Sequence, residues 1–260
     1  MNHWRGRWAL VTGGSAGIGR ALAEQLAAGG ANLVLTARRA DRLEELATNL
    51  SARHGIRTAI CAADLARPQA PQEIHEFCRC EGAGVDVLIN NAGFGAYGEL
   101  HGQDPARLLE MVQVNCAAVV ALTRLFLPAM VERRKGDILI VASTAGFQAV
   151  PYITTYAATK GFDLLFAEGL AEEVRPYGVR VCCLCPGSTA TEFHDVARQP
   201  EHTKHRQETA EKVARVGLQA LAGGKSYVIS GLGNYLGMQG QRLVPRRLVT
   251  RITAGMFRPK

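Results

Sequence analysis

The stretch "WALVTGGSAGIG", residues 8–19, joins a short apolar run to a glycine-rich turn. Gly13, Gly17 and Gly19 allow a tight turn and a close approach of the backbone to a ligand. Residues 17–29 continue with helical periodicity, so free N–H groups and a positive helix end face the turn. Such turns also occur without a ligand, and the Gly-x-x-x-Gly-x-Gly spacing differs from the common Gly-x-Gly-x-x-Gly. The strand–turn–helix context favours binding of a dinucleotide pyrophosphate.

Beyond this stretch, short apolar runs rich in β-formers alternate with segments of helical periodicity. The expected strands are 8–12, 32–36, 57–61, 86–90, 137–143, 179–185 and 226–230. The expected helices are 17–29, 40–54, 69–81, 104–134, 154–176 and 207–222. Continuously apolar strands alternating with helices predict an α/β fold whose parallel sheet is covered on both faces. Without a linker or repeat, residues 1–260 are interpreted as one doubly wound Rossmann-type domain.

The composition indicates a globular protein with a sizeable core, since 47% of its 260 residues are hydrophobic. The apolar run 114–131 contains Asn115, Arg124 and Pro128 and is more typical of a core helix than of a bilayer span. No signal peptide is expected at the start. Seven cysteines, an odd number in a large chain, favour a reducing, cytoplasmic environment.

Two groups of residues suggest metal or redox chemistry, and we expect neither to provide it. Cys182, Cys183 and Cys185 lie on an expected buried strand, where successive side chains point to opposite faces. His194, His202 and His205 lie in a polar segment, and their spacing fits no standard site. The sequence therefore predicts no metal.

The end of the second strand, "LVLTARRADRL" (33–43), bears on which dinucleotide is bound. An acidic residue here would bind the adenosine ribose of NAD. Ala37 occupies that position, and Arg38 and Arg39 follow it. A guanidinium can hold the 2′-phosphate of NADP through two hydrogen bonds, although arginines at a helix start are often only solvated. We expect NADP(H), with NAD(H) as the alternative.

The stretch "YAATK" (156–160) places Tyr156 and Lys160 one helical turn apart on one face. Alone, this spacing is often coincidence. A free Tyr has a pKa of about 10, and a neighbouring ammonium favours its phenolate, which would make Tyr156 an acid for ketone reduction and a base for alcohol oxidation. Ser143, at the end of an expected strand, would hydrogen-bond the substrate oxygen.

Six motifs in register resemble those of the short-chain dehydrogenase/reductase family over about residues 7–230. They are "TGGSAGIG" (12–19), "NNAG" (90–93), Asn115, Ser143, "YAATK" and "PGSTAT" (186–191). The resemblance implies a seven-stranded sheet of order 3-2-1-4-5-6-7. "NNAGFGAYGEL" (90–100) and the basic tail look like the NADP-preferring branch of ketone and ketoacyl reductases.

The resemblance also implies roles for individual residues. Asn115 would hold a water that contacts Lys160, and Lys160 would hold the nicotinamide ribose, which completes a catalytic set of Asn115, Ser143, Tyr156 and Lys160. Ala16 stands where some NADP-dependent members carry a basic residue, so Arg38 and Arg39 would hold the phosphate alone. The implied cofactor contacts are Gly13, Ser15, Ala16, Gly17, Ile18, Gly19, Arg38, Arg39, Asp64, Leu65, Asn90, Asn91, Ala92, Gly93, Tyr156, Lys160, Pro186, Gly187, Thr189 and Thr191.

Apolar and aromatic residues in the same loops predict a hydrophobic substrate, although each could equally belong to the core. The expected walls are Phe94, Tyr97, Phe147, Val150, Tyr152 and Phe193. The polar segment of about 192–215 is interpreted as a substrate lid that is poorly ordered without ligand.

The tail of about 240–260 is basic. Of the net charge of +7, nine positive charges and no negative ones lie after residue 211, so the rest of the chain carries −2. A basic amphipathic helix after Pro245 would contact a membrane surface, pack on a partner subunit or lie across the substrate mouth. Nucleic acid binding is not expected, because the tail has almost no aromatic residues.

These patterns together predict an NADP(H)-dependent oxidoreductase acting on a hydrophobic ketone or secondary alcohol. The alternative is a catalytically silent NADP(H) sensor or scaffold of the same fold, which the intact catalytic set argues against. The long helices 104–134 and 154–176 resemble the pair that forms dimers in the family, so a homodimer or homotetramer is expected.

Overall fold

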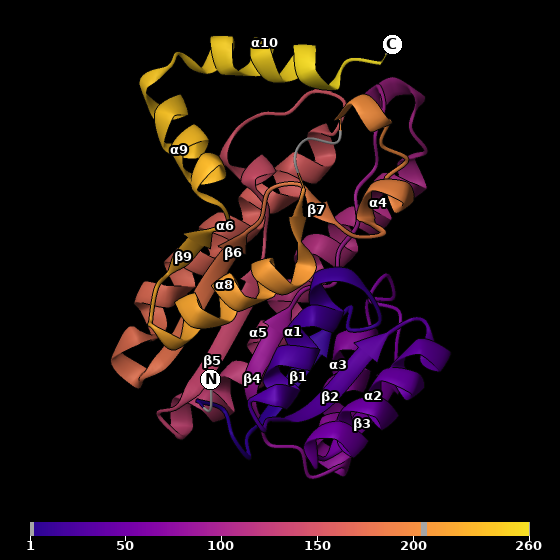
Figure 1. The fold of residues 1–260 in the computed structure, drawn as a ribbon, viewed down its shortest axis with the longest axis vertical. Helices are drawn as coiled ribbons and strands as arrows, with labels where there is room; N and C mark the ends of the chain where they lie inside the picture. Colours follow the sequence, from indigo (N-terminus) through magenta and orange to yellow (C-terminus); the bar gives the residue numbers. More distant parts are fainter. Residues whose placement is uncertain (1–2, 204–206, 260) are drawn as a thin grey trace.

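The computed structural model describes residues 3–203 and 207–259 and is built around one parallel sheet (Figure 1). Seven strands are hydrogen-bonded in the order β3-β2-β1-β4-β5-β6-β9, which confirms the predicted sheet and strand order. The strands are β1 (Trp8–Thr12), β2 (Asn32–Ala37), β3 (Thr58–Ala62), β4 (Val85–Asn90), β5 (Gly136–Val141), β6 (Val179–Cys185) and β9 (Tyr227–Ile229).

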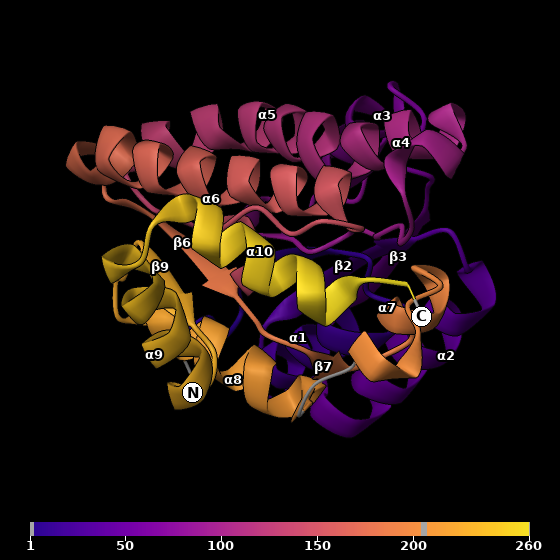
Figure 2. The same cartoon turned by 90° about the horizontal axis from the view of Figure 1, so that it is seen from above.

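Helices cover both faces of this sheet (Figure 2). One layer consists of α1 (Gly17–Ala28), α2 (Ala40–His54) and α8 (Ala210–Ala222). The other contains α3 (Ala70–Cys80), α4 (Pro105–Val112), α5 (Ala118–Glu132) and α6 (Thr154–Val174). Alternate strand residues enter opposite cores: Ile138 and Ile140 pack in one core cluster, and Leu139 packs in the other. This two-sided burial explains why the strands are continuously apolar.

The predicted single helix 104–134 is interrupted. Asp104 caps α4 by accepting a hydrogen bond from the Ala106 N–H at 3.0 Å, and the π-helical segment η2 (Gln113–Ala117) separates α4 from α5. A π-helical turn holds one extra residue, which rotates the side chains that follow, and such turns often mark functional sites. Here the turn carries the buried Asn115. The joint segment Pro105–Glu132 is long and apolar enough for a membrane span by composition, but it packs on the domain core.

The segment after β6 is folded where the structure describes it. Two short strands, β7 (Thr189–Ala190) and β8 (Glu208–Thr209), pair with each other. Helix α7 (Phe193–Val196) follows β7, and residues 204–206 of the expected lid lie outside the described residues. The low order expected of this lid therefore stays a prediction.

The tail forms two helices, of which only the second was expected from the sequence. Helix α9 (Leu232–Gly240) leads away from β9, and α10 (Arg246–Phe257) begins directly after Pro245. Figures 1 and 2 show α10 crossing above the carboxyl ends of the strands. Parallel α/β sheets bind ligands at that edge, so the tail forms part of the surroundings of the site.

Candidate active site

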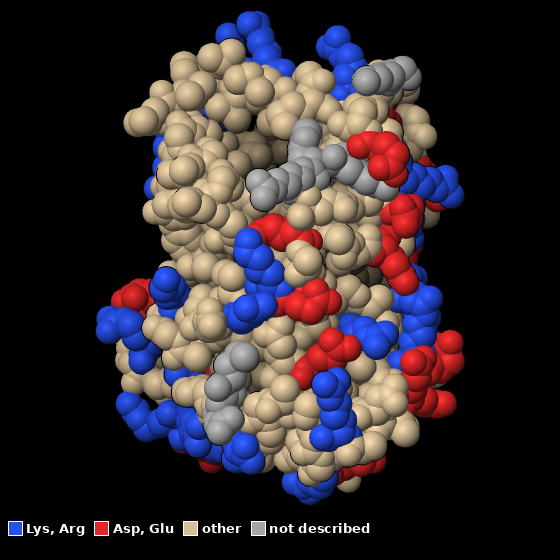
Figure 3. Space-filling view, in the orientation of Figure 1, with Lys and Arg blue, Asp and Glu red and all other residues tan. Residues whose placement is uncertain are grey.

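A cavity of about 810 Å³ extends along the carboxyl edge of the sheet from the glycine turn to the tail helices. Figure 3 shows the surface hollowed beneath the tail. The cavity accommodates an elongated ligand, with its phosphate-binding end at the start of α1 and its other end beneath α10.

The glycine turn is fixed by its contacts with the loop that follows β4. Gly13 has a φ of +65°, and a Cβ at Gly19 would lie only 2.3 Å from the Gly13 carbonyl oxygen, so neither position accepts a side chain. The Thr12 hydroxyl accepts hydrogen bonds from the N–H groups of Asn91 (2.9 Å) and Ala92 (3.0 Å). The turn lines the cavity with Gly13, Ser15, Ala16, Gly17, Ile18 and Gly19.

The adenosine end of the cavity combines the arginines after β2 with residues after β3. Arg38, Arg39, Asp64 and Leu65 all line it, and Ala37 leaves no carboxylate at the end of β2. Arg39 donates to the Glu192 carboxylate at 2.8 Å and to the Ser15 hydroxyl at 3.3 Å. These residues fit a phosphorylated ribose, because the guanidinium groups of Arg38 and Arg39 both lie there.

Most other expected cofactor contacts also line the cavity. They are Asn91, Ala92, Gly93, Pro186, Gly187, Thr189 and Thr191. Asn90 does not belong to this set: it is buried against α5, where its side-chain amide donates to the Thr123 hydroxyl at 3.0 Å. Its place in the "NNAG" motif therefore serves packing between strand and helix.

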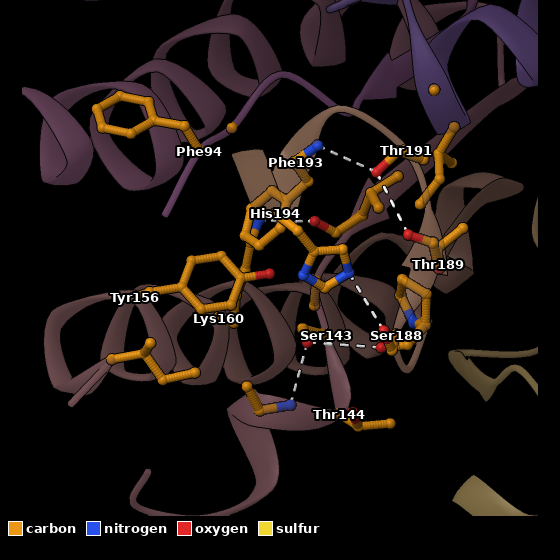
Figure 4. A pocket seen from close by; sticks show the side chains of 18 of the residues that line it. Phe94, Ser143, Thr144, Tyr156, Lys160, Ser188, Thr189, Thr191, Phe193 and His194 are labelled. Carbon is orange, nitrogen blue, oxygen red and sulfur yellow. Dashed lines mark hydrogen bonds between the residues drawn. The ribbon is translucent and has the colours of Figure 1, made fainter. Parts of the chain in front are cut away.

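The proposed acid–base residues meet in the middle of the cavity. Figure 4 shows Tyr156 and Ser143 facing the same part of it, with Phe193 and His194 beside them. Tyr156 and Lys160 lie on one face of α6 and are 8% and 5% exposed, and Ser143 follows β5. All three line the cavity, as expected for ligands bound at the carboxyl edge.

Burial controls the acidity of Tyr156. Desolvation raises the pKa of its phenol, and the opposing influences of the Lys160 ammonium and a hydrogen bond with Ser143 are smaller. Lys160 lowers the pKa of the phenol, as expected, but in the protein chain by itself burial outweighs this effect and the net pKa is raised. The phenol is kept protonated, which suits a proton donor.

The Lys160 ammonium has two buried acceptors that sequence reasoning missed. Its Nζ donates to the Val141 carbonyl and to Asp163 Oδ2, each at 2.8 Å. Burial alone would lower the pKa of Lys160, but the carboxylate of Asp163 and the phenol of Tyr156 outweigh it and raise that pKa above its usual value. The only sequence signal was an acidic residue three positions after Lys160 in an apolar stretch.

Asn115 is fully buried and does not line the cavity. Its side chain accepts from the Phe94 N–H at 3.1 Å and donates to the Phe94 carbonyl and the Thr159 hydroxyl, both at 3.0 Å. Asn115 thus ties the loop after β4 to α6. Its expected contact with a water beside Lys160 stays a prediction.

The substrate end of the cavity differs from the expectation. Phe94, Val150 and Phe193 line it, and the Phe193 ring lies 5.1 Å from that of Tyr156. The other three expected wall residues do not line it: Tyr97, Phe147 and Tyr152. The Tyr97 hydroxyl donates to the Phe257 carbonyl at 2.8 Å, and Phe147 packs beside Tyr227, so these rings support the walls from behind.

The tail supplies a further wall, and α10 lies across the substrate mouth, which was one of the three alternatives for the helix after Pro245. The Thr253 hydroxyl donates to the Ala149 carbonyl at 3.0 Å, which joins α10 to the loop after β5. This inner face is largely apolar. Among the lining residues from the tail are Met238, Val244, Val249, Ile252, Met256 and Phe257. An amphipathic pattern was visible in the sequence, but the side on which it packs was not.

Comparison with known proteins agrees with this fold and site. The short chain dehydrogenase family model matches residues 7–202, and the chain belongs to that family. Among curated relatives, the very-long-chain 3-oxoacyl-CoA reductase of Bos taurus is 36% identical over 229 residues, which are 85% of this chain and 72% of the relative.

Two solved structures share the architecture. A short-chain dehydrogenase from Sphingobium yanoikuyae in complex with NADPH has a TM-score of 0.83 at 29% identity, with 91% of this chain and 93% of that chain covered. The L-sorbose reductase of Gluconobacter frateurii, complexed with NADPH and L-sorbose, has a TM-score of 0.79 at 28% identity, with 89% and 98% covered. The chain is accordingly an oxidoreductase of the class that interconverts carbonyl and alcohol groups.

Proposed function

We propose that this protein is an NADP(H)-dependent reductase of a hydrophobic ketone, able in reverse to oxidise the corresponding secondary alcohol. The observation that carries this proposal is one cavity that joins Arg38 and Arg39, the Ser143–Tyr156–Lys160 group and the apolar inner face of the tail. The NADPH complexes of two structural neighbours support the cofactor assignment.

Tyr156, Ser143 and Lys160 have different roles in the proposed reduction. When bound, the nicotinamide supplies or accepts the hydride. The phenol of Tyr156 donates a proton to the developing alkoxide, and the Ser143 hydroxyl hydrogen-bonds the same oxygen. Lys160 holds the ribose and stabilises the phenolate left on Tyr156. The surrounding apolar walls exclude water from the reacting atoms.

The first substrate class to test is a 3-oxoacyl thioester with a long chain. A relative acts as a very-long-chain 3-oxoacyl-CoA reductase, and a structural neighbour reduces the polar ketose L-sorbose. The walls of this cavity beyond Tyr156 favour the former, because Val249, Met256 and Phe257 offer apolar surface and few hydrogen-bonding groups to a sugar.

A screen of NADPH oxidation over aliphatic, aromatic, steroid and acyl-thioester ketones tests this assignment. We expect turnover with apolar ketones and none with ketoses. Tight NADPH binding with no turnover on any ketone would instead support the silent sensor or scaffold, and preferred turnover of ketoses would overturn the substrate class.

We also propose a homo-oligomer formed through the outer layer of α4, α5 and α6. Large apolar side chains on these helices are exposed: Leu109 (70%), Val112 (41%), Val120 (38%), Phe162 (40%) and Leu165 (72%). Monomers rarely expose so much apolar surface in one region, and a second copy is the simplest cover for it. Light scattering tests this, since a monomer at micromolar concentration would contradict it.

For the outer face of the tail we propose contact with an anionic membrane surface from a reducing, cytoplasmic side. Leu243 and Leu248 do not line the cavity and are 90% and 49% exposed. Arg246 and the other tail arginines have no acidic residue near them in sequence, so their charge complements anionic lipid. Such contact would place the apolar end of the cavity near a source of hydrophobic substrate.

A further inference from the structure

Asp163 is a fully buried carboxylate in the middle of α6, one turn after Lys160. Its Oδ2 lies 2.8 Å from Lys160 Nζ, and its Oδ1 is buried without a hydrogen-bond partner among the described residues. An unpaired buried charge is strongly unfavourable, so the Lys160 ammonium stabilises this carboxylate in the core. The chemistry assigned to Tyr156, Ser143 and Lys160 does not by itself require it.

The surroundings of Asp163 contain no other described cation that competes for it. On its own helix it faces Lys160 and, more distantly, Tyr156. From η2 and β6 it meets the thiols of Cys116 and Cys183. Burial raises the pKa of Cys116 to about 11, and a hydrogen bond with Cys185 together with burial raises that of Cys183, so both thiols stay neutral at physiological pH. Lys160 is therefore the only described positive charge in direct contact with Asp163.

The ion pair between Lys160 and Asp163 also determines where the Lys160 ammonium lies. With the Val141 carbonyl and Asp163 both at 2.8 Å, two of the three Nζ protons are directed toward β5 and the interior of α6. A Cβ at Gly93 would lie 3.5 Å from Nζ, so the absence of a side chain there leaves room beside the ammonium. The third proton is free to serve the ribose and the phenol.

We propose that Asp163 is a positioning residue for Lys160: its carboxylate anchors the ammonium and offsets part of the charge that Tyr156 experiences. The consequence is a phenol that holds its proton more firmly than it would beside an unpaired lysine. Such tuning favours ketone reduction, in which Tyr156 acts as an acid, over alcohol oxidation. The inference rests on the proposed function, because it assumes that Tyr156 is the acid–base group.

Ultraviolet titration of the phenol tests the inference without any substrate. Absorbance at 295 nm is followed against pH in the NADP⁺ complex of the full chain and of Tyr156→Phe, and the difference reports Tyr156 alone. The same difference is measured with Asp163→Asn in both backgrounds, and again with Asp163→Leu should the amide variant unfold. We expect the titration midpoint of Tyr156 to move to lower pH when the carboxylate is removed.

Asp137→Asn is the matched control, because Asp137 is equally buried but lies at the opposite end of β5, paired with Arg180. Asp137→Asn should lower the stability of the fold, because it removes a buried ion pair. It should leave the titration midpoint of Tyr156 unchanged. An unchanged or higher midpoint in the Asp163 variants would overturn the proposal. A failed ketone screen would leave this titration interpretable, so the two proposals fail separately.

With a substrate in hand, the pH profile of alcohol oxidation offers a second measurement. The rising limb of this profile should shift to lower pH in Asp163→Asn. The fall of kcat for ketone reduction at alkaline pH should likewise begin at a lower pH than in the unmodified chain. A purely structural Asp163 would instead lower the yield of folded protein and leave both profiles where they are in the unmodified chain.

Discussion

Arg39 Nη1 lies 2.8 Å from the carboxylate of Glu192, so a residue of the segment after β7 spans the adenosine end of the cavity. Arg42 reaches the same carboxylate at 2.7 Å, and both arginines lower the pKa of Glu192. Arg39, one of the two arginines expected to hold the 2′-phosphate of NADP, is thus already paired with an anion of the protein.

Glu192→Gln should therefore tighten NADPH binding. The phosphate no longer competes with a carboxylate for Arg39, and since the pair is partly exposed the gain should be at most about fivefold in Kd. Fluorescence titration of NADPH checks this, with NADH as the control ligand because it lacks the phosphate. Weaker NADPH binding in the variant would mean that Glu192 supports the site rather than competes with it.

Arg38→Ala should weaken NADPH binding by about tenfold or more while changing NADH binding little, because a charge-assisted hydrogen bond to the 2′-phosphate is worth roughly 1.5–3 kcal/mol. The Arg38 side chain is 61% exposed and its ion pair with Glu110 is long, at 3.9 Å, so its guanidinium can turn to the phosphate. Parallel losses for both cofactors would refute the phosphate contact.

Tyr156→Phe should lower kcat for ketone reduction by roughly 10²- to 10⁴-fold, the usual contribution of a positioned proton donor. NADPH affinity should persist, because the ring still packs against Phe193. Steady-state kinetics and cofactor titration on the same preparation separate the two effects. Full activity in this variant would remove Tyr156 from the mechanism.

Ketone reduction and alcohol oxidation should differ in their pH dependence. Burial raises the pKa of Tyr156, so the protonated phenol needed for reduction persists across the neutral range and is lost only at alkaline pH. Alcohol oxidation needs the phenolate, and its rate should rise with pH over that same alkaline range. Initial rates in both directions check the sign, and oxidation that is fastest at acidic pH would contradict it.

The tail should bind anionic vesicles through charge. The full chain should sediment with phosphatidylserine-containing vesicles and not with phosphatidylcholine alone, and the double change Arg246→Glu and Arg247→Glu should abolish this. Arg79→Glu is the matched control, because Arg79 on α3 is also exposed and lies outside the tail. Equal sedimentation of all three proteins would end the membrane proposal.

Much of the fold could be predicted because its signals are local. A glycine turn after an apolar run and strands without polar alternation each act within a few residues. The π-helical turn at Asn115 could not be predicted, because the hydrogen bonds that hold this side chain come from Phe94 and Thr159, which are distant in sequence.

The sequence could predict those residues of the site whose position follows from the carboxyl edge of the sheet. Ser143 after β5 and Tyr156 on α6 meet because parallel strands end at one edge. Tyr97 and Phe147 were wrong as lining residues because aromatic character does not reveal which side of a loop faces a cavity.

The sequence by itself determined the class of this protein, since the spacing of its glycines and of Tyr156 and Lys160 is a property of neighbouring residues. Only the tertiary structure decided how these residues are tuned. The burial that raises the pKa of Tyr156, the 2.8 Å contact between Lys160 and Asp163 and the return of α10 over the cavity all depend on the packing of the folded chain. Solvent exclusion and electrostatic distance are set by that packing, and neither can be read from the order of residues along the chain.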